Sequence, residues 1–186
     1  VSAAIFANFS SFIQMFILLA SINLIFLSRN IVYIFSISIS AVLIGIYFLK
    51  REDKKSENLT ETKENLKNDK LFSLMPALKF ALLFLLIKLI TKFSLIVFGN
   101  NGFIISTILG AVTGLDAVTI NTAELAGKTI SYQTGVVTLI LANAVNLFAK
   151  SGYAFTQGSR PFAKKFFISV LVIIAFSFLG VIPFIR

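Results

Sequence analysis

The sequence predicts an all-α integral membrane protein with about six transmembrane helices. Hydrophobic residues make up 57% of its 186 residues and charged residues only 13%, a more apolar mixture than soluble domains have. The apolar residues form runs close to the ~20 residues that a helix needs to cross ~30 Å of hydrocarbon. The net charge is +9, but the basic residues lie in loops and at the ends of these runs. That arrangement favours a lipid bilayer, rather than nucleic acid, as the partner.

Six apolar runs set the expected order of the helices. We expect them at residues 8–27, 31–49, 78–98, 102–124, 132–149 and 166–185. Only Ser28, Arg29 and Asn30 separate the first two runs, which predicts a tight antiparallel hairpin with its turn at these residues. The fourth run is expected to be kinked or broken near Gly110 and Gly114.

Residues 51–70 divide the chain into two parts. They are almost entirely polar or charged, and we expect a solvated linker because they cannot bury enough apolar surface to offset the entropy lost on ordering. Residues 1–50 would form a two-helix hairpin. Residues 71–186 would form a four-helix domain that holds most of the polar intramembrane residues, and function is expected there.

The distribution of basic residues predicts which side of the membrane each loop faces. If the fourth run crosses, Lys128 lies on the linker side and Arg160 on the opposite side, and the linker side holds more basic residues. The linker side is then cytoplasmic, in the cell membrane of a bacterium or archaeon. If residues 102–124 are re-entrant instead, everything after them changes sides.

Asp116 is the first candidate for a functional residue. It lies near the middle of an apolar run, where an ionised carboxylate costs about 2.5–3.5 kcal/mol on insertion scales, so it needs a partner, a proton or water. A structural ion pair is the alternative. On a continuous helix Asn121 would share one face with Gly110 and Gly114. That glycine pair predicts either close helix packing or a kink that opens backbone groups to an ion.

Other polar candidates lie on neighbouring runs. Asn143, Asn146 and Lys150 fall at positions i, i+3 and i+7, within an arc of about 60° on a helix. They could join helices by hydrogen bonds or line a polar space opposite Asp116, and both interpretations stay open. Lys88 lies near the middle of the third run and could reach an interface or neutralise Asp116.

The residues that are absent exclude several classes of protein. The chain has no cysteine and no histidine, which excludes thiolate zinc sites, a cysteine nucleophile and histidine acid–base catalysis. Neither paired carboxylates at motif spacing nor a zinc-protease motif occurs, so we expect no enzyme and no cofactor. The sequence does not identify a metal, although an inorganic cation is an expected partner.

Four segments carry a resemblance to a known family. They are, in order, LFSLMPALKFALLF, GNNGF, STILGAVTGLDAVTINTAELA and ANAVNLFAKSGYAFTQGSR. Their order resembles the C-terminal domain of MgtC/SapB-type membrane proteins, the domain of unknown function 4010. The positions that match the family pattern are Pro76, Ala77, Leu78 and Phe80, then Gly114, Asp116 and Ala117, then Asn146 and Lys150.

The chain departs from that family at two places. Asp116 stands alone where the family often has two aspartates, which weakens a metal-binding inference because one carboxylate is a sparse site for a hard cation. Gln14 stands where a basic residue is expected. The resemblance implies an association with magnesium limitation and a fused or associated MgtC-like helical domain, but no known reaction.

Two functions remain as hypotheses. The first is a transporter or channel-like protein for an inorganic ion, linked through the resemblance to magnesium homeostasis, or for a small solute. The alternative is a non-transporting regulatory or assembly subunit, in a homo-oligomer or with another helical domain, whose polar residues join helices.

Overall fold

The computed structural model describes residues 1–53 and 74–179, which form six α-helices and no β-sheet. The helices are α1 (Ser2–Ile22), α2 (Leu24–Asp53), α3 (Leu74–Ala111), α4 (Leu115–Leu125), α5 (Tyr132–Gln157) and α6 (Arg160–Ser177). The all-α prediction is therefore confirmed. The predicted linker at 51–70 lies outside the described residues, apart from its first three positions.

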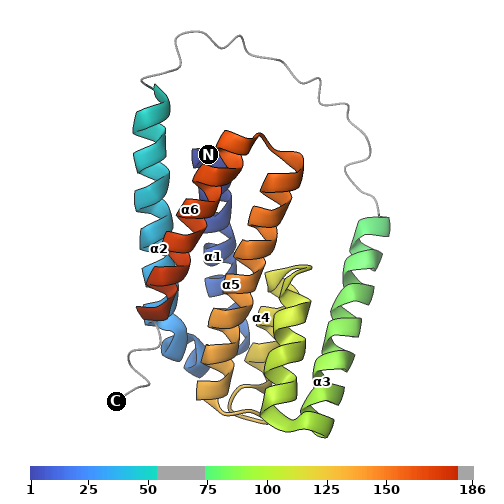
Figure 1. The fold of residues 1–186 in the computed structure, drawn as a ribbon. Helices are drawn as coiled ribbons and strands as arrows, with labels where there is room; N and C mark the ends of the chain where they lie inside the picture. Colours follow the sequence, from blue (N-terminus) through green and yellow to red (C-terminus); the bar gives the residue numbers. More distant parts are fainter. Residues whose placement is uncertain (54–73, 180–186) are drawn as a thin grey trace.

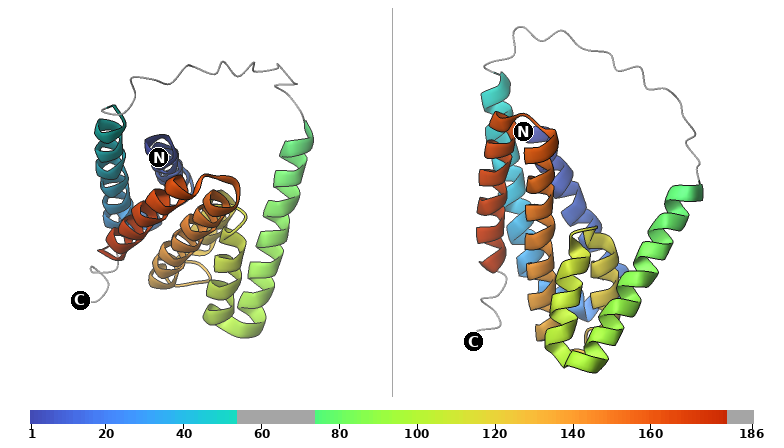
Figure 2. Two further views of the ribbon diagram at one scale, coloured as in Figure 1. Left: turned by 45° about the horizontal axis from the view of Figure 1, so that its top comes forward. Right: turned by 45° about the vertical axis from the view of Figure 1, so that its right-hand side comes forward.

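Helices α1, α2, α5 and α6 pack as a bundle (Figures 1 and 2). Helix α4 lies against α1 and α5, and α3 lies against α4 and α5. We call the end of the bundle where α2 ends and α3 begins the linker end, and the α5–α6 connection lies there as well. The turns at Asn23, at Gly99 and between α4 and α5 lie at the other end, which we call the turn end (Figure 1).

The turn between α1 and α2 is at Asn23, so the predicted turn at residues 28–30 is wrong. Asn23 has extended backbone (φ −153°, ψ 91°), and its side-chain oxygen accepts a hydrogen bond of 2.9 Å from the Phe26 amide. This is the usual way in which asparagine caps the start of a helix. Asn30 lies inside α2 and donates to the Phe26 carbonyl at 2.8 Å, so it continues the helix.

The predicted fourth span, residues 102–124, is broken as expected. Helix α3 kinks at Gly99, whose φ of 62° is available mainly to glycine, and then turns back toward the linker end (Figure 1). It ends at Ala111, residues 112–114 are not helical, and α4 runs back to the turn end. We call residues 102–125 the half-length hairpin, because each arm is roughly 15 Å long against ~30 Å of hydrocarbon.

The number of spans that the described helices support is smaller than predicted. Four helices are long and apolar enough to cross a membrane, namely α1, α2, α3 and α5. Helix α4 is too short at 11 residues, and α6 carries Arg160, Lys164 and Lys165 within its 18 residues. The prediction of six complete spans is thus not supported, although long apolar helices are compatible with a membrane protein.

The break also changes the roles of the two glycines. Because residues 112–114 interrupt the helix, Gly110 and Gly114 do not lie on one continuous face as predicted. A Cβ atom at Gly110 would lie 3.4 Å from Ile87 and 3.5 Å from Val118, so Gly110 lies in a packed contact. A Cβ at Gly114 would meet nothing within 4 Å. The packing interpretation is wrong for Gly114, which precedes α4 at the break.

We expect Leu115→Ala to destabilise the protein and Gly114→Ala to leave its stability nearly unchanged. Leu115 is only 7% exposed, and truncating a buried leucine costs about 2–5 kcal/mol in well-packed cores. Gly114 has extended backbone and open space around it. Thermal unfolding of the two purified variants in detergent measures the difference. A fall in melting temperature as large for Gly114→Ala as for Leu115→Ala would contradict the position of the break.

Candidate functional site

The tip of the half-length hairpin, residues 111–116, lies beside the middle of α5. The Asn146 side chain donates a buried hydrogen bond of 2.8 Å to the Ala111 carbonyl. Thr113 donates to the Gly110 carbonyl through its amide at 3.1 Å and through its hydroxyl at 2.7 Å. The break leaves the carbonyls of Gly110 and Ala111 without partners in the helix, and both still accept hydrogen bonds, that of Ala111 from α5. The C-terminus of α3 and the N-terminus of α4 meet at this tip.

Asp116 lies in the first turn of α4 and is half-buried. Its carboxylate accepts a hydrogen bond of 3.1 Å from the side-chain amide of Gln14 on α1. The N-terminus of a helix stabilises a negative charge by about 0.3–1 kcal/mol. The charge of Asp116 is thus supported by the dipole of α4 and by a neutral donor.

Lys150 supplies a positive charge near Asp116 without contacting it. Its ammonium donates a hydrogen bond of 2.9 Å to the side-chain oxygen of Asn8 on α1. The Asp116 carboxylate attracts Lys150 through space, but the described residues contain no direct ion pair between the two. We call Asn8, Gln14, Asp116 and Lys150 the tip cluster. Helices α1, α4 and α5 each contribute to it.

A surface groove connects the tip cluster to the linker end. It has a volume of about 330 Å³ and lies between α1, α5 and α6. Lys150 lines it together with Ala4, Tyr153, Ala154, Gln157, Gly158, Phe162 and Phe166. The amine of Lys150 therefore lies between this groove and the tip of the hairpin.

Two other predicted residues lie away from the tip. Asn121 is buried and donates to the Thr91 hydroxyl at 2.7 Å, which joins α4 to α3. Lys88 pairs with Glu124 at 2.5 Å, so the predicted alternative in which it neutralises Asp116 is wrong. The kink at Gly99 turns the second part of α3 back beside the first part. The first part, which carries Lys88, therefore lies beside the C-terminal half of α4, away from Asp116.

Asn143 also contacts a different helix from the one expected. It is buried in the bundle and faces Tyr33 of α2. Of the three polar residues predicted on one face of α5, Asn146 contacts the hairpin tip and Lys150 contacts α1. This face of α5 therefore meets three neighbouring elements, namely α2, the hairpin tip and α1.

Sequence reasoning missed the residues that α1 contributes to the site. Asn8 and Gln14 belong to the tip cluster although they precede the linker, where no functional residue was sought. A carboxamide side chain in an otherwise apolar run was the signal that could have found them, because such residues are costly in lipid.

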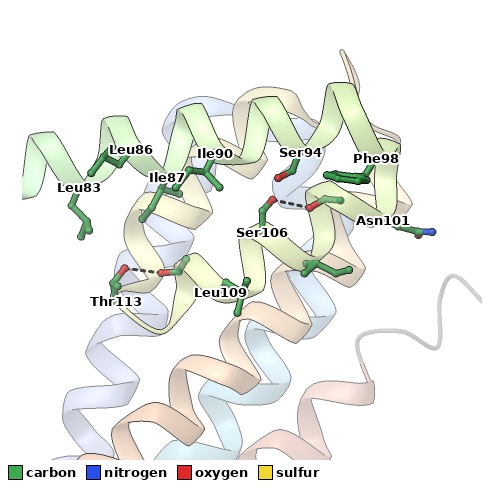
Figure 3. Close-up of a pocket in the computed structure, with 13 residues that line it drawn as sticks. Leu83, Leu86, Ile87, Ile90, Ser94, Phe98, Asn101, Ser106, Leu109 and Thr113 are labelled. Atoms are coloured by element: carbon green, nitrogen blue, oxygen red, sulfur yellow. Dashed lines mark hydrogen bonds between the residues drawn. The ribbon is translucent and has the colours of Figure 1, made fainter.

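A second groove, of about 870 Å³, lies elsewhere and is mainly apolar (Figure 3). It runs between the two parts of α3 on either side of the Gly99 kink. Its polar side chains include Ser106 and Thr113, which donate to the carbonyls of Gly102 and Gly110 in their own helix (Figure 3). Because these hydroxyls already donate within their own helix and the groove is mainly apolar, we place the candidate site at the tip cluster.

The donor set at the tip limits how a cation could bind there. In the part of the chain that the structure describes, no three side chains among His, Cys, Asp and Glu gather in one place. A cation beside Asp116 would find one carboxylate there, because Gln14 presents its amide nitrogen to that carboxylate and the Asn8 oxygen accepts from Lys150. Such a site suits a cation that keeps several of its waters, as Mg²⁺ commonly does.

Comparison with known proteins gives a family but no activity. The family described as "Domain of unknown function (DUF4010)" matches residues 1–158, which include the tip cluster. A protein of Aquifex aeolicus (strain VF5) named "Uncharacterized protein" is 32% identical over 100 residues, which cover 53% of this chain and 43% of that protein. The chain thus matches less than half the length of this relative. No solved structure matches the chain.

We expect Asn146→Leu to destabilise the hairpin tip. The substitution keeps the approximate side-chain size but leaves the buried Ala111 carbonyl without its donor, which costs about 1–3 kcal/mol. Gln133→Leu is the matched control, because Gln133 is exposed on the same helix. Thermal unfolding should show a lower melting temperature for Asn146→Leu alone. Equal melting temperatures of the two variants would mean that the tip does not depend on α5.

Proposed function

The chain belongs to the DUF4010 family, and we propose that it is a multi-pass membrane protein that moves an inorganic cation or small solute as a transporter or channel. The observation that supports this most is the position of Asp116. It lies at the tip of a half-length hairpin inside an apolar bundle and has no direct ion pair among the described residues. Intramembrane carboxylates and discontinuous helices are typical of ion pathways.

The exposed surface supports insertion in a bilayer. Many large apolar side chains on α3 are more than half exposed, including Leu78, Leu82, Phe93, Ile96 and Phe98. In water a patch of this kind would promote association, whereas hydrocarbon solvates it at no cost. Insertion would therefore explain why α3 lies at the edge of the bundle with little cover.

The half-length hairpin supports a polar space at its tip. Non-helical backbone is tolerated at membrane depth only where it is buried in protein or lines a hydrated cavity. Residues 112–114 are not helical, and Val112 and Thr113 are exposed. If the bundle spans the bilayer, water or another polar group has to lie beside these residues.

The basic residues support a cytoplasmic linker end. The half-length hairpin returns to the turn end, so Lys128 lies at the turn end and Arg160 at the linker end, the reverse of the sequence prediction for a complete fourth span. Described basic residues in loops or near helix ends are Lys50, Arg51, Lys79, Arg160, Lys164 and Lys165 at the linker end, against Arg29 and Lys128 at the turn end. This excess supports a cytoplasmic linker end under the positive-inside rule.

The tip cluster supports a cation as the substrate, with Mg²⁺ as the first to test. Lys150 balances the charge of Asp116 at a distance, and an entering cation would take over that role at the carboxylate. The resemblance to MgtC/SapB-type proteins adds a link to magnesium limitation. Both arguments favour a partly hydrated divalent cation over an anion.

One observation favours the alternative, a non-transporting regulatory or assembly subunit. The apolar groove of about 870 Å³ beside α3 and the exposed faces of that helix could be covered by a second copy or by an MgtC-like helical domain. In that case the polar residues would serve helix packing alone.

We expect Asp116→Asn to abolish cation flux without unfolding the protein. Asparagine retains an oxygen that can accept the bond from Gln14, and no directly paired lysine is left behind. Flux of Mg²⁺ into proteoliposomes loaded with a magnesium-sensitive dye measures the effect, and a loss of at least tenfold is expected.

Glu124→Gln is the matched control, because it removes the other carboxylate of α4, which pairs with Lys88. It should keep its flux and lose some thermal stability. Wild-type flux in folded Asp116→Asn would remove Asp116 from the mechanism. A wild-type protein without flux of Mg²⁺, other divalent or monovalent cations, or protons would favour the regulatory subunit.

Labelling of single cysteines tests the orientation, since the natural chain has no cysteine. We expect a membrane-impermeant maleimide to label Ser159→Cys from the same side as Arg51→Cys, and Thr129→Cys from the other side. All three positions are exposed. Labelling of Thr129→Cys from the side of Arg51→Cys would show that residues 102–124 cross completely.

A further inference from the structure

The groove between α1, α5 and α6 ends at two side chains that have hydrogen-bond donors to spare. The Lys150 ammonium donates to the Asn8 oxygen at 2.9 Å and has further N–H groups beyond that one. Asn8 is only 2% exposed, and its side-chain nitrogen has no hydrogen-bond partner among the described residues. Buried polar atoms are nearly always bonded, so this unused donor points to a group that brings an acceptor.

Both side chains lie at the inner end of this groove. Lys150 lines it, and Asn8 lies one turn further along α1 than Ala4, which also lines it. Residues four apart share a face of a helix, so Asn8 lies behind Lys150 at the floor. Lys150 is two turns from the end of α5 at Gln157, roughly 10 Å along the axis. If the bundle spans the bilayer, the groove opens into the headgroup region at the linker end.

The helices that line the groove carry positive charges only. None of α1, α5 and α6 contains an Asp or Glu. Lys150 lies at the inner end, and three exposed basic residues follow Gly158, which lies at the rim, in the first two turns of α6: Arg160, Lys164 and Lys165. The groove therefore presents a positive potential to the headgroup region, where it attracts anionic groups.

We propose that this groove binds the headgroup of an anionic phospholipid. The phosphate accepts hydrogen bonds from the Lys150 ammonium, and from Asn8 once its side chain turns toward the groove. The walls suit the rest of the lipid, because Ala154 and the stacked rings of Phe162 and Phe166 are apolar. A free phosphate would leave these walls unused, and a zwitterionic headgroup would bring a further cation among the basic residues. Basic pockets between transmembrane helices at the cytoplasmic side are suited to such headgroups.

Native mass spectrometry of the full chain in detergent measures lipid binding directly. We expect phosphatidylglycerol to bind about fivefold more tightly than phosphatidylcholine, the ratio that corresponds to about 1 kcal/mol for one basic side chain near a membrane surface. Lys150→Met should abolish this preference, because it keeps the apolar stem and removes the ammonium. Lys79→Met is the matched control and should keep the preference, since Lys79 is exposed at the linker end of α3 and does not line the groove.

A second variant tests the groove without changing any charge. Ala154→Leu places a larger side chain in the wall, so it should also abolish the preference, and it decides the question if Lys150→Met does not fold. Retention of the preference in either folded variant would overturn the site. An equal loss in Lys79→Met would overturn it in favour of net charge alone. Displacement of phosphatidylglycerol by inorganic phosphate at the same concentration would overturn the lipid as the occupant.

This inference rests on the membrane insertion proposed above, but not on transport. The binding measurement involves no flux, so the two proposals fail separately. A protein that prefers phosphatidylglycerol but moves no cation would overturn transport alone. Cation flux from a protein with equal affinity for the two lipids would overturn the lipid site alone.

Discussion

The half-length hairpin depends on hydrogen bonds that asparagine side chains supply to freed backbone carbonyls. A helix that ends in apolar surroundings leaves peptide groups that water cannot reach. Asn146 satisfies the carbonyl of Ala111 at the end of α3, and Asn23 donates to the carbonyls of Ala123 and Ala126 at the end of α4, at 3.1 and 3.0 Å. These contacts fix the hairpin to α5 at its tip and to the α1–α2 turn at its base. The position of Asp116 follows from them.

The two carboxylates of α4 show why position decides their roles. Glu124, near the C-terminal end, pairs directly with Lys88, and that pairing joins α4 to α3. Asp116, at the N-terminal end, accepts a hydrogen bond from the neutral side chain of Gln14. Lys150, the lysine that attracts Asp116 through space, is bonded to Asn8 instead. A charge held by a dipole and a neutral donor can accept a cation without first breaking an ion pair. This difference makes Asp116, rather than Glu124, the candidate for a binding role.

The sequence predicted those features that depend on local composition. Long apolar runs predicted an all-α chain, and Gly110 and Gly114 correctly placed the break in the fourth run. Where contacts between distant helices decide, prediction failed. The residues predicted to share a face across the break do not share one, because that prediction assumed a continuous helix. Lys88 pairs with Glu124 because the kink at Gly99 redirects α3. The contributions of Asn8 and Gln14 required knowledge of which helix lies beside α4.

Helix α5 is long and apolar enough to cross a membrane, yet it carries a dense group of polar side chains. Asn143, Asn146 and Lys150 lie within two turns, yet they face three different neighbours. Asn143 faces a core tyrosine, Asn146 bonds to a broken helix end and Lys150 bonds to α1. A helix serving only to pack the bundle would do so with small apolar residues at lower cost. Local rules of this kind are broken in proteins mainly at functional sites. The shared face of α5 therefore connects the tip cluster, the hairpin break and the buried Tyr33.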